Sequence, residues 1–144
     1  MAYVKNWLHC VWGTKNRTHY LITEIRPEVI DHINQNAASK GIYMKTLNGS
    51  KEHLHCLLSL DPEKSLSYVM QLIKGESSFW INKHQITKYR FEWAEEYYAV
   101  SVSESDLHGV IRYIDNQEEH HRKKSWDEEC REFMTKYGFD KFPG

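Results

Sequence analysis

Alternating side chains near the N-terminus predict a β-strand. Leu8, Cys10 and Trp12 fall on one face, and the residues between them are also large and mostly apolar. A period of two with both faces rich in apolar groups is typical of a strand covered on both sides. We therefore expect residues 4–12 to form a strand inside a sheet.

Two further apolar runs, at 42–47 and 53–60, flank Asn48-Gly49-Ser50-Lys51. Asn-Gly is a strong signal for a tight hairpin turn. A fourth strand is predicted from Tyr98 to Val102, where apolar side chains again alternate with small ones.

Helical spacing of apolar residues predicts the other elements. One helix is expected between Thr23 and Lys40, with Pro27 in its first turn, and a second from Ser65 to Lys83. A third runs from Leu107 towards residue 124, and a terminal one covers about 126–137.

The resulting order, β-α-β-β-α-β followed by helices, predicts an α+β protein with the ferredoxin-like split βαβ arrangement. This is a four-stranded antiparallel sheet with helices on one face, plus further C-terminal helices. A length of 144 residues with 40% apolar side chains suits one domain over residues 1–144. Because the chain lacks an uncharged apolar stretch of about 18 residues and a signal-peptide pattern, we expect a cytoplasmic protein without a membrane anchor.

The three cysteines, Cys10, Cys56 and Cys130, are odd in number and far apart. This spacing favours buried, reduced thiols over a disulfide framework or a zinc ribbon.

The charge is nearly balanced overall but unevenly distributed. The net charge of −1 argues against a protein that binds duplex DNA simply as a cation. Residues 1–26 and 63–90 each carry a net charge of +3, whereas 91–106 carry −5. An anionic partner is therefore compatible with the sequence, away from the acidic segment.

His53 and His55 are candidates for metal binding. Alternation along a strand places the two imidazoles on one face, about 7 Å apart. In that position they could chelate a divalent metal, or they could simply be exposed or hydrogen-bonded. The spacing alone does not decide between these interpretations.

A second candidate group lies on the predicted third helix. Tyr113, Gln117 and His120 fall within an arc of about 60°, beside the apolar face of the helix. A tyrosine in this position could serve chemistry, or it could pack at the boundary with its hydroxyl in water.

Together these motifs resemble the His-hydrophobic-His nucleases, and within them the single-tyrosine transposases of IS200-like insertion sequences. The resemblance rests on His53-Leu54-His55 followed by Tyr113 and Gln117. It is strengthened, in order along the chain, by the stretches 9–17, 72–78, 91–93, 101–103 and 113–121. One departure is the segment Ala94-Glu95-Glu96-Tyr97-Tyr98, where many members have Gln-x-Gly-Tyr.

This resemblance implies a DNA transposase that cleaves and rejoins single-stranded DNA through a 5′-phosphotyrosine on Tyr113. It implies Mg²⁺ or Mn²⁺ held by His53, His55 and Gln117, with His120 as an auxiliary group. It also implies hairpin-bearing DNA ends as substrate, and a homodimer in which one subunit's tyrosine helix can complete the other's site. Gly109 and residues 103–106 would then serve as hinge elements.

Basic and aromatic residues are candidates for DNA contacts. The basic ones are Lys5, Lys15, Arg17, Lys74, Lys83, Lys88 and Arg90, and the rings are Trp12, Trp80 and Tyr89. Two alternatives stay open: a catalytically idle hairpin-DNA-binding protein or repressor of the same fold, and a metal-dependent hydrolase that forms no covalent adduct.

Overall fold

The computed structural model of the chain describes residues 2–117, 119 and 123–139. A four-stranded antiparallel sheet, ordered β2-β3-β1-β4, lies at its centre. The strands are β1 (Trp7–Gly13), β2 (Tyr43–Gly49), β3 (His53–Ser59) and β4 (Tyr98–Ser101). The helices are α1 (Arg26–Ser39), α2 (Leu66–Lys83), α3 (Leu107–Asp115) and α5 (Trp126–Lys136), with 3-10 turns at Lys15–Arg17 and Glu104–Asp106.

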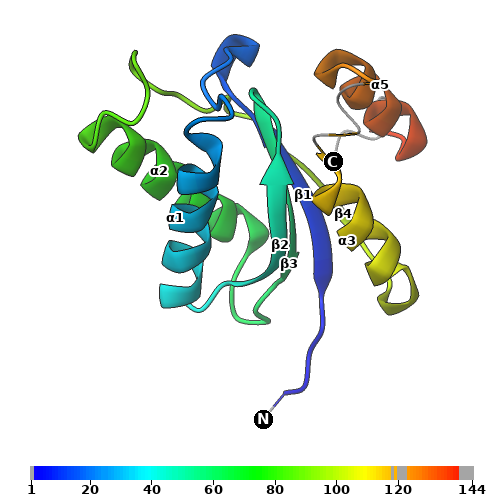
Figure 1. The fold of residues 1–144 in the computed structure, drawn as a ribbon. Helices are drawn as coiled ribbons and strands as arrows, with labels where there is room; N and C mark the ends of the chain where they lie inside the picture. Colours follow the sequence, from blue (N-terminus) through cyan, green and yellow to red (C-terminus); the bar gives the residue numbers. More distant parts are fainter. Residues whose placement is uncertain (1, 118, 120–122, 140–144) are drawn as a thin grey trace.

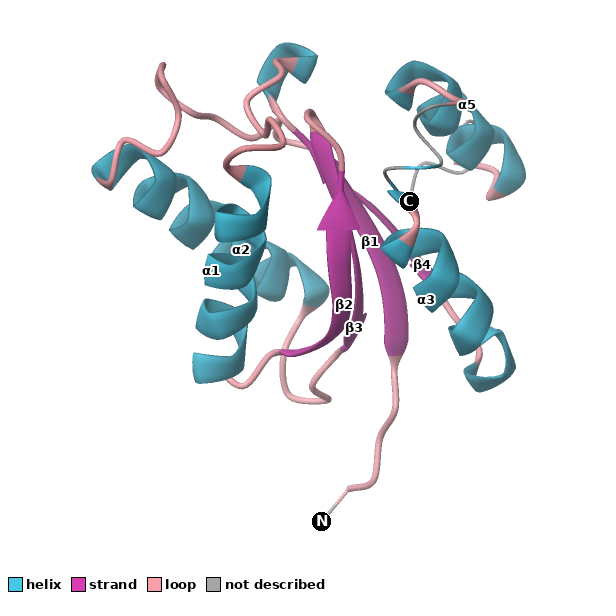
Figure 2. Cartoon of the chain, viewed as in Figure 1, coloured by secondary structure: helices cyan, strands magenta, loops and turns pink. Residues whose placement is uncertain are grey.

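Helices cover both faces of the sheet. In Figures 1 and 2, α1 and α2 lie on one face, and α3 and α5 lie on the other. The strand order and the α1/α2 layer confirm the predicted ferredoxin-like α+β fold. The second layer contains the predicted tyrosine helix and the C-terminal helix.

The main core lies between the sheet and the α1/α2 layer. Trp12, Leu54 and Leu58 are fully buried there, against helix residues such as Val29 and Met70. Burying each large apolar side chain contributes roughly 1.5–3 kcal/mol. This packing fixes which face of β1 and β3 points inward, and so directs their other residues towards α3 and α5.

A smaller apolar cluster lies on the opposite face. Val11 of β1 packs against Trp126, Cys130 and Phe133 of α5. The three α5 residues are spaced i, i+4 and i+7, which places them on one side of the helix. Ser125 begins the helix by accepting a hydrogen bond from the backbone N–H of residue 128 at 3.2 Å.

The β2–β3 hairpin turns later than the sequence predicts. Asn48 and Gly49 belong to β2 and pair with residues of β3, and residues 50–52 make the turn. A Cβ atom on Gly49 would lie 2.2 Å from the carbonyl oxygen of His53. Glycine is therefore required here by the close approach of the two strands. The Asn-Gly signal identified the hairpin but not its turn residues.

Helix α3 ends at Asp115, so Asn116 interrupts the predicted helical course towards Lys124, although residues 117 and 119 are again helical. Asn116 leaves helical geometry, with φ −100° and ψ 22°. Thr46 donates a hydrogen bond to the Asp115 carboxylate at 2.5 Å, and Asn48 donates to the Asp115 carbonyl at 3.0 Å. These contacts tie the end of the tyrosine helix to β2 of the same chain.

The three cysteines are free and buried, as predicted. Burial raises the pKa of the Cys130 thiol to about 11, which keeps it protonated. Within the described part of the chain, none of the helices combines the length and the apolar character needed to cross a membrane.

Candidate metal and tyrosine site

His53 and His55 lie on the face of β3 that turns away from the main core. Both imidazoles are fully buried, and their ring centroids lie 5.0 Å apart. The structure therefore places the two side chains on one face, as the alternation predicts. The main core holds Leu54 between them on the opposite face.

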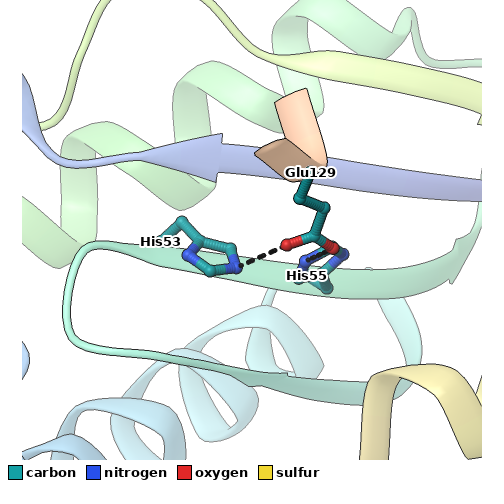
Figure 3. Close-up of side chains that lie close together, drawn as sticks. All are labelled: His53, His55 and Glu129. Atoms are coloured by element: carbon teal, nitrogen blue, oxygen red, sulfur yellow. Dashed lines mark ion pairs between the residues drawn. The ribbon is translucent and has the colours of Figure 1, made fainter. Parts of the chain in front are cut away.

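Glu129 of α5 extends into the space beside these histidines (Figure 3). Its carboxylate oxygens lie 3.1 Å from His55 Nε2 and 3.5 Å from His53 Nε2. The three side chains are buried, and their ligand atoms all lie within 4.8 Å of one another. Two imidazoles and a carboxylate thus converge on one point.

Tyr113 of α3 and Gln117, which lies two residues beyond the end of that helix, reach the same point. The Tyr113 hydroxyl donates a hydrogen bond to the Glu129 carboxylate. The side-chain oxygen of Gln117, which is fully buried, lies 3.4 Å from His53 Nε2. Gln117 also donates to the carbonyl of Tyr113 at 3.2 Å, which links Gln117 to α3.

The other ring nitrogen of each histidine has its own partner. His53 Nδ1 lies 3.0 Å from a carboxylate oxygen of Glu52, and the second oxygen of Glu52 lies 3.5 Å from His19 Nε2. His55 Nδ1 lies 2.9 Å from His9 Nε2 on the neighbouring strand β1. His9 and Glu52 are themselves buried.

Burial and charge alter the protonation of this group. Burial lowers the pKa of His9 to about 4 and that of His55 to about 3, so both rings are neutral at pH 7. For His53, burial is outweighed by the hydrogen bonds and negative charges of Glu129 and Glu52, which raise its pKa. Burial, reinforced by Glu129, raises the pKa of Tyr113 above its usual value.

The donor set fits a divalent metal ion. Among the described residues, His55 Nε2 makes no hydrogen bond although it is buried, and it faces a Glu129 oxygen. A ring nitrogen lone pair facing a carboxylate is an arrangement that a cation between them would stabilise. Imidazole nitrogens with carboxylate and amide oxygens suit Mn²⁺, Mg²⁺ or Zn²⁺.

The sequence prediction missed Glu129, and with it the only acidic group at this point of convergence among the described residues. A signal for it existed. Glu129 is three residues after Trp126 and four before Phe133, inside the apolar stripe of α5. An acid in a buried stripe is rare unless it is paired or binds a metal. His120, the predicted auxiliary group, lies outside the described residues.

A cleft opens beside the histidines. It has a volume of about 870 Å³ and reaches both Glu52 and Trp126, each of which contacts His53. Its lining is rich in basic residues, namely Arg17, His19, Arg26, Lys51, Lys123 and Lys124, against the acids Glu24, Glu52 and Asp127. The excess of positive charge in this lining would therefore attract a single-stranded anionic polymer towards the site.

The basic residues predicted to contact DNA have different surroundings. Arg17 lies in this cleft and pairs with Asp127 at 2.8 Å. Lys15 pairs with Glu92 at 3.1 Å. The ammonium of Lys83 lies over the ring of a neighbouring phenylalanine, that of Lys88 lies over the ring of Tyr89, and Arg90 is exposed. Their role in DNA binding stays a prediction.

The three aromatic residues predicted to stack on DNA bases differ in their exposure to solvent. Trp12 is fully buried in the main core, so it is not available to stack on bases. Trp80 stacks on His32, with ring centroids 3.9 Å apart. Tyr89 is 71% exposed and remains a candidate for stacking.

The acidic segment 91–106 contacts lysines of its own chain. Glu92 pairs with Lys15, and Glu104 pairs with Lys5 at 3.2 Å. Lys74 donates hydrogen bonds to the carbonyls of residues 94 and 95 at 2.7 and 2.9 Å. Lys74 thus holds the backbone where the sequence departs from the family pattern.

Comparisons with known proteins agree with this architecture. A family model described as "Transposase IS200 like" matches residues 2–117. The ISDra2 transposase TnpA of Deinococcus radiodurans is 25% identical over 114 residues, which are 76% of this chain and 81% of that protein. A crystal structure of a putative transposase from the same organism is similar with a TM-score of 0.62 at 25% identity, over 81% of this chain and 95% of that one. The structure of a REP-associated tyrosine transposase bound to a REP hairpin has the same fold, with a TM-score of 0.62 at 17% identity, over 88% of this chain and 73% of that one.

Proposed function

Because the chain belongs to the IS200-like transposase family, we propose that it cleaves and rejoins single-stranded DNA through a covalent phosphotyrosine on Tyr113. The observation that carries this proposal is the meeting of Tyr113 with His53 and His55. The three side chains come from α3 and β3 of one chain, and the Glu129 carboxylate contacts all of them.

In this reaction the Tyr113 oxygen attacks a phosphodiester. A bond forms between that oxygen and phosphorus, and the bond from phosphorus to the 3′-oxygen breaks. The phenolic proton passes to Glu129, its hydrogen-bond acceptor, and the released 3′-oxygen takes a proton from solvent. Attack by another 3′-hydroxyl reverses the step. The phosphotyrosine conserves the bond energy, so rejoining needs no nucleotide cofactor.

His53, His55 and Gln117 would hold the divalent metal that the family resemblance implies, and Glu129 adds an anionic donor. Mg²⁺ or Mn²⁺ bound there would neutralise charge on the phosphate. The protein residues align the nucleophile. Gln117 donates a hydrogen bond to the Tyr113 carbonyl, so this candidate ligand is tied to the helix that carries the attacking hydroxyl.

The proposed substrate is single-stranded DNA with hairpin ends. One structural relative is bound to a REP hairpin, and it shares the fold of this chain. The basic cleft beside His53 supports a path for the strand to be cut. We also propose a cytoplasmic homodimer. Its sites would be complete within each subunit, because the described residues of one chain already bring Tyr113 to His53 and His55.

A covalent-adduct assay tests the proposal. The protein is incubated with labelled hairpin-bearing single strands and Mn²⁺ or Mg²⁺, then denatured. We expect a protein–DNA species that resists denaturation, depends on the metal and disappears in Tyr113→Phe. Tyr98→Phe is a matched control. This tyrosine of β4 packs against the cluster around Val11, and it is not part of the metal group among the described residues.

The same assay separates the alternatives. Binding of the hairpin without cleavage would indicate the idle DNA-binding protein. Cleavage with no trapped adduct would indicate a hydrolase and would rule out the tyrosine mechanism.

A further inference from the structure

We propose that Glu52 and His9 are positioning residues that fix the ring orientation and the tautomer of His53 and His55, so that both Nε2 atoms face the metal. The inference rests on the proposed metal site. It concerns residues that neither the family motif nor the convergent donor group includes.

Glu52 acts on His53 from the hairpin turn. Its carboxylate lies 3.0 Å from His53 Nδ1, in reach of a charge-assisted hydrogen bond. With the proton of the neutral ring held on Nδ1, Nε2 keeps its lone pair for a metal. Trp126 stacks on the same ring with centroids 4.0 Å apart and an angle of 4° between planes, which fixes the ring against rotation.

The backbone holds Glu52 in this position. Its carbonyl accepts hydrogen bonds from the N–H of Thr14 at 2.8 Å and from the Thr14 hydroxyl at 3.2 Å. The carbonyl of Lys51 accepts one from the N–H of Leu21 at 2.9 Å. Thr14 directly follows β1, so the turn that carries Glu52 is tied to the end of the central strand.

His9 acts on His55 across β1 and β3. His9 Nε2 lies 2.9 Å from His55 Nδ1, and the ring centroids lie 5.1 Å apart. When His55 binds a metal through Nε2, its proton must be on Nδ1, and His9 Nε2 is then the acceptor. His9 also packs edge-on against Tyr113 and Phe133, so α3 and α5 limit its movement.

Burying Glu52 and His9 costs free energy that fold stability alone does not explain. Glu52 is 6% exposed and His9 is 5% exposed. Burying an acid or an imidazole costs free energy unless its hydrogen bonds are satisfied. Their partners here are the Nδ1 atoms of His53 and His55, whose Nε2 atoms face Glu129 and, for His53, also Gln117. This is the arrangement in which carboxylate or imidazole partners raise the basicity of ligating histidines.

Metal binding without DNA tests the inference. Mn²⁺ affinity is measured by electron paramagnetic resonance or calorimetry on the whole protein. We expect Glu52→Gln and His9→Leu each to lower the affinity about 10- to 100-fold. His9→Gln, whose amide oxygen can accept from His55 Nδ1, should recover most of the loss. Glu76→Gln is the matched control, because it alters another His–carboxylate pair, to His32 at 2.8 Å, away from the site.

The tautomers are read directly by long-range ¹H–¹⁵N NMR of the Zn²⁺-bound protein. We expect protonated Nδ1 and metal-bound Nε2 for both histidines in the wild type. Metal bound through Nδ1, or unchanged affinity in both Glu52→Gln and His9→Leu, would overturn the positioning role. Neither readout uses DNA. A wild type that binds metal with these tautomers but forms no adduct would instead overturn the proposed function.

Discussion

Trp126 lies flat on His53, with ring centroids 4.0 Å apart and an interplanar angle of 4°. This contact makes α5 a wall of the candidate site. One turn further along the same helix, Glu129 reaches both histidines and Tyr113. The family model ends at residue 117, so this contribution comes from a part of the chain beyond the matched region.

Replacing Glu129 with glutamine should weaken metal binding to the DNA-free protein. The carboxylate is the anionic donor of the convergent group, and Mg²⁺ and Mn²⁺ prefer charged oxygen ligands. We expect Mn²⁺ affinity to fall by about tenfold or more, measured by calorimetry. Glu128→Gln removes an exposed acid of the same helix and should leave the affinity unchanged. Equal affinities in the two variants would exclude Glu129 as a ligand.

The same substitution should make Tyr113 easier to ionise. Burial and the Glu129 carboxylate both raise the pKa of Tyr113, because the phenolate would be desolvated and would face a negative charge. Removing that charge should lower the phenol pKa, while burial keeps it above its usual value. The test is the absorbance change on alkaline titration, taken as the difference between each protein and its Tyr113→Phe counterpart. A higher pKa in Glu129→Gln would contradict the expected direction.

Stability without metal should fall as the pH drops from 6.5 to 5. His9 and His55 have pKa values lowered to about 4 and about 3, against an ordinary value of 6.5. In this window the unfolded chain takes up their protons and the folded chain does not. Each histidine therefore removes up to about 1 kcal/mol per pH unit from the free energy of unfolding. His53, with a raised pKa, keeps its proton in the folded chain, so it partly offsets this slope near pH 6.5, where the unfolded ring is half protonated, and adds little near pH 5.

Urea denaturation in the presence of a chelator, repeated at several pH values, measures how the free energy of unfolding depends on pH. His9 faces Glu129 and Lys136 of α5, Tyr113 of α3 and His55 of β3. In His9→Gln the slope should fall to roughly half, because one of the two neutral histidines is gone. An unchanged slope would show that these rings are not the groups that take up protons on unfolding.

Local patterns were enough to predict the main strands and helices, whereas the meeting of Tyr113 with His53 and His55 was implied by the family resemblance. Alternation placed both imidazoles on one face of β3, and the family motif connected them to the tyrosine helix. The predicted turn began two residues too early, because Asn48-Gly49 also suits a close approach of strands and Gly49 serves that purpose here. A pattern read along one strand cannot distinguish these two demands.

The partners of the site were harder to predict, since they come from separate elements. Glu129 lies 74 positions after His55 along the chain, and only the packing of α5 on the sheet brings them to 3.1 Å. His9 faces His55 through the pairing of β1 with β3. Such contacts depend on tertiary register, which the sequence of either element alone does not specify.

Charge in the cleft beside His53 should govern the affinity for single-stranded DNA. Arg17 and Lys51 line this cleft, whereas Lys45 is exposed on the edge strand β2 and is not part of the lining. We expect Arg17→Gln and Lys51→Gln each to weaken binding and to reduce the slope of log affinity against log salt by about 1. Lys45→Gln should change neither quantity. A similar loss in all three variants would indicate a general charge effect without a defined path.

Mixing two inactive variants should show whether each subunit works alone. Asp115 at the end of α3 accepts hydrogen bonds from Thr46 and Asn48 of β2 in its own chain, at 2.5 and 3.0 Å. These bonds hold Tyr113 beside its own His55, with ring centroids 5.5 Å apart. We therefore expect that a mixture of Tyr113→Phe and His55→Ala forms no covalent adduct, because neither chain holds a complete site. Recovered activity in the mixture would show instead that the tyrosine helix is exchanged between subunits, and that the contacts of Asp115 break when a dimer binds DNA.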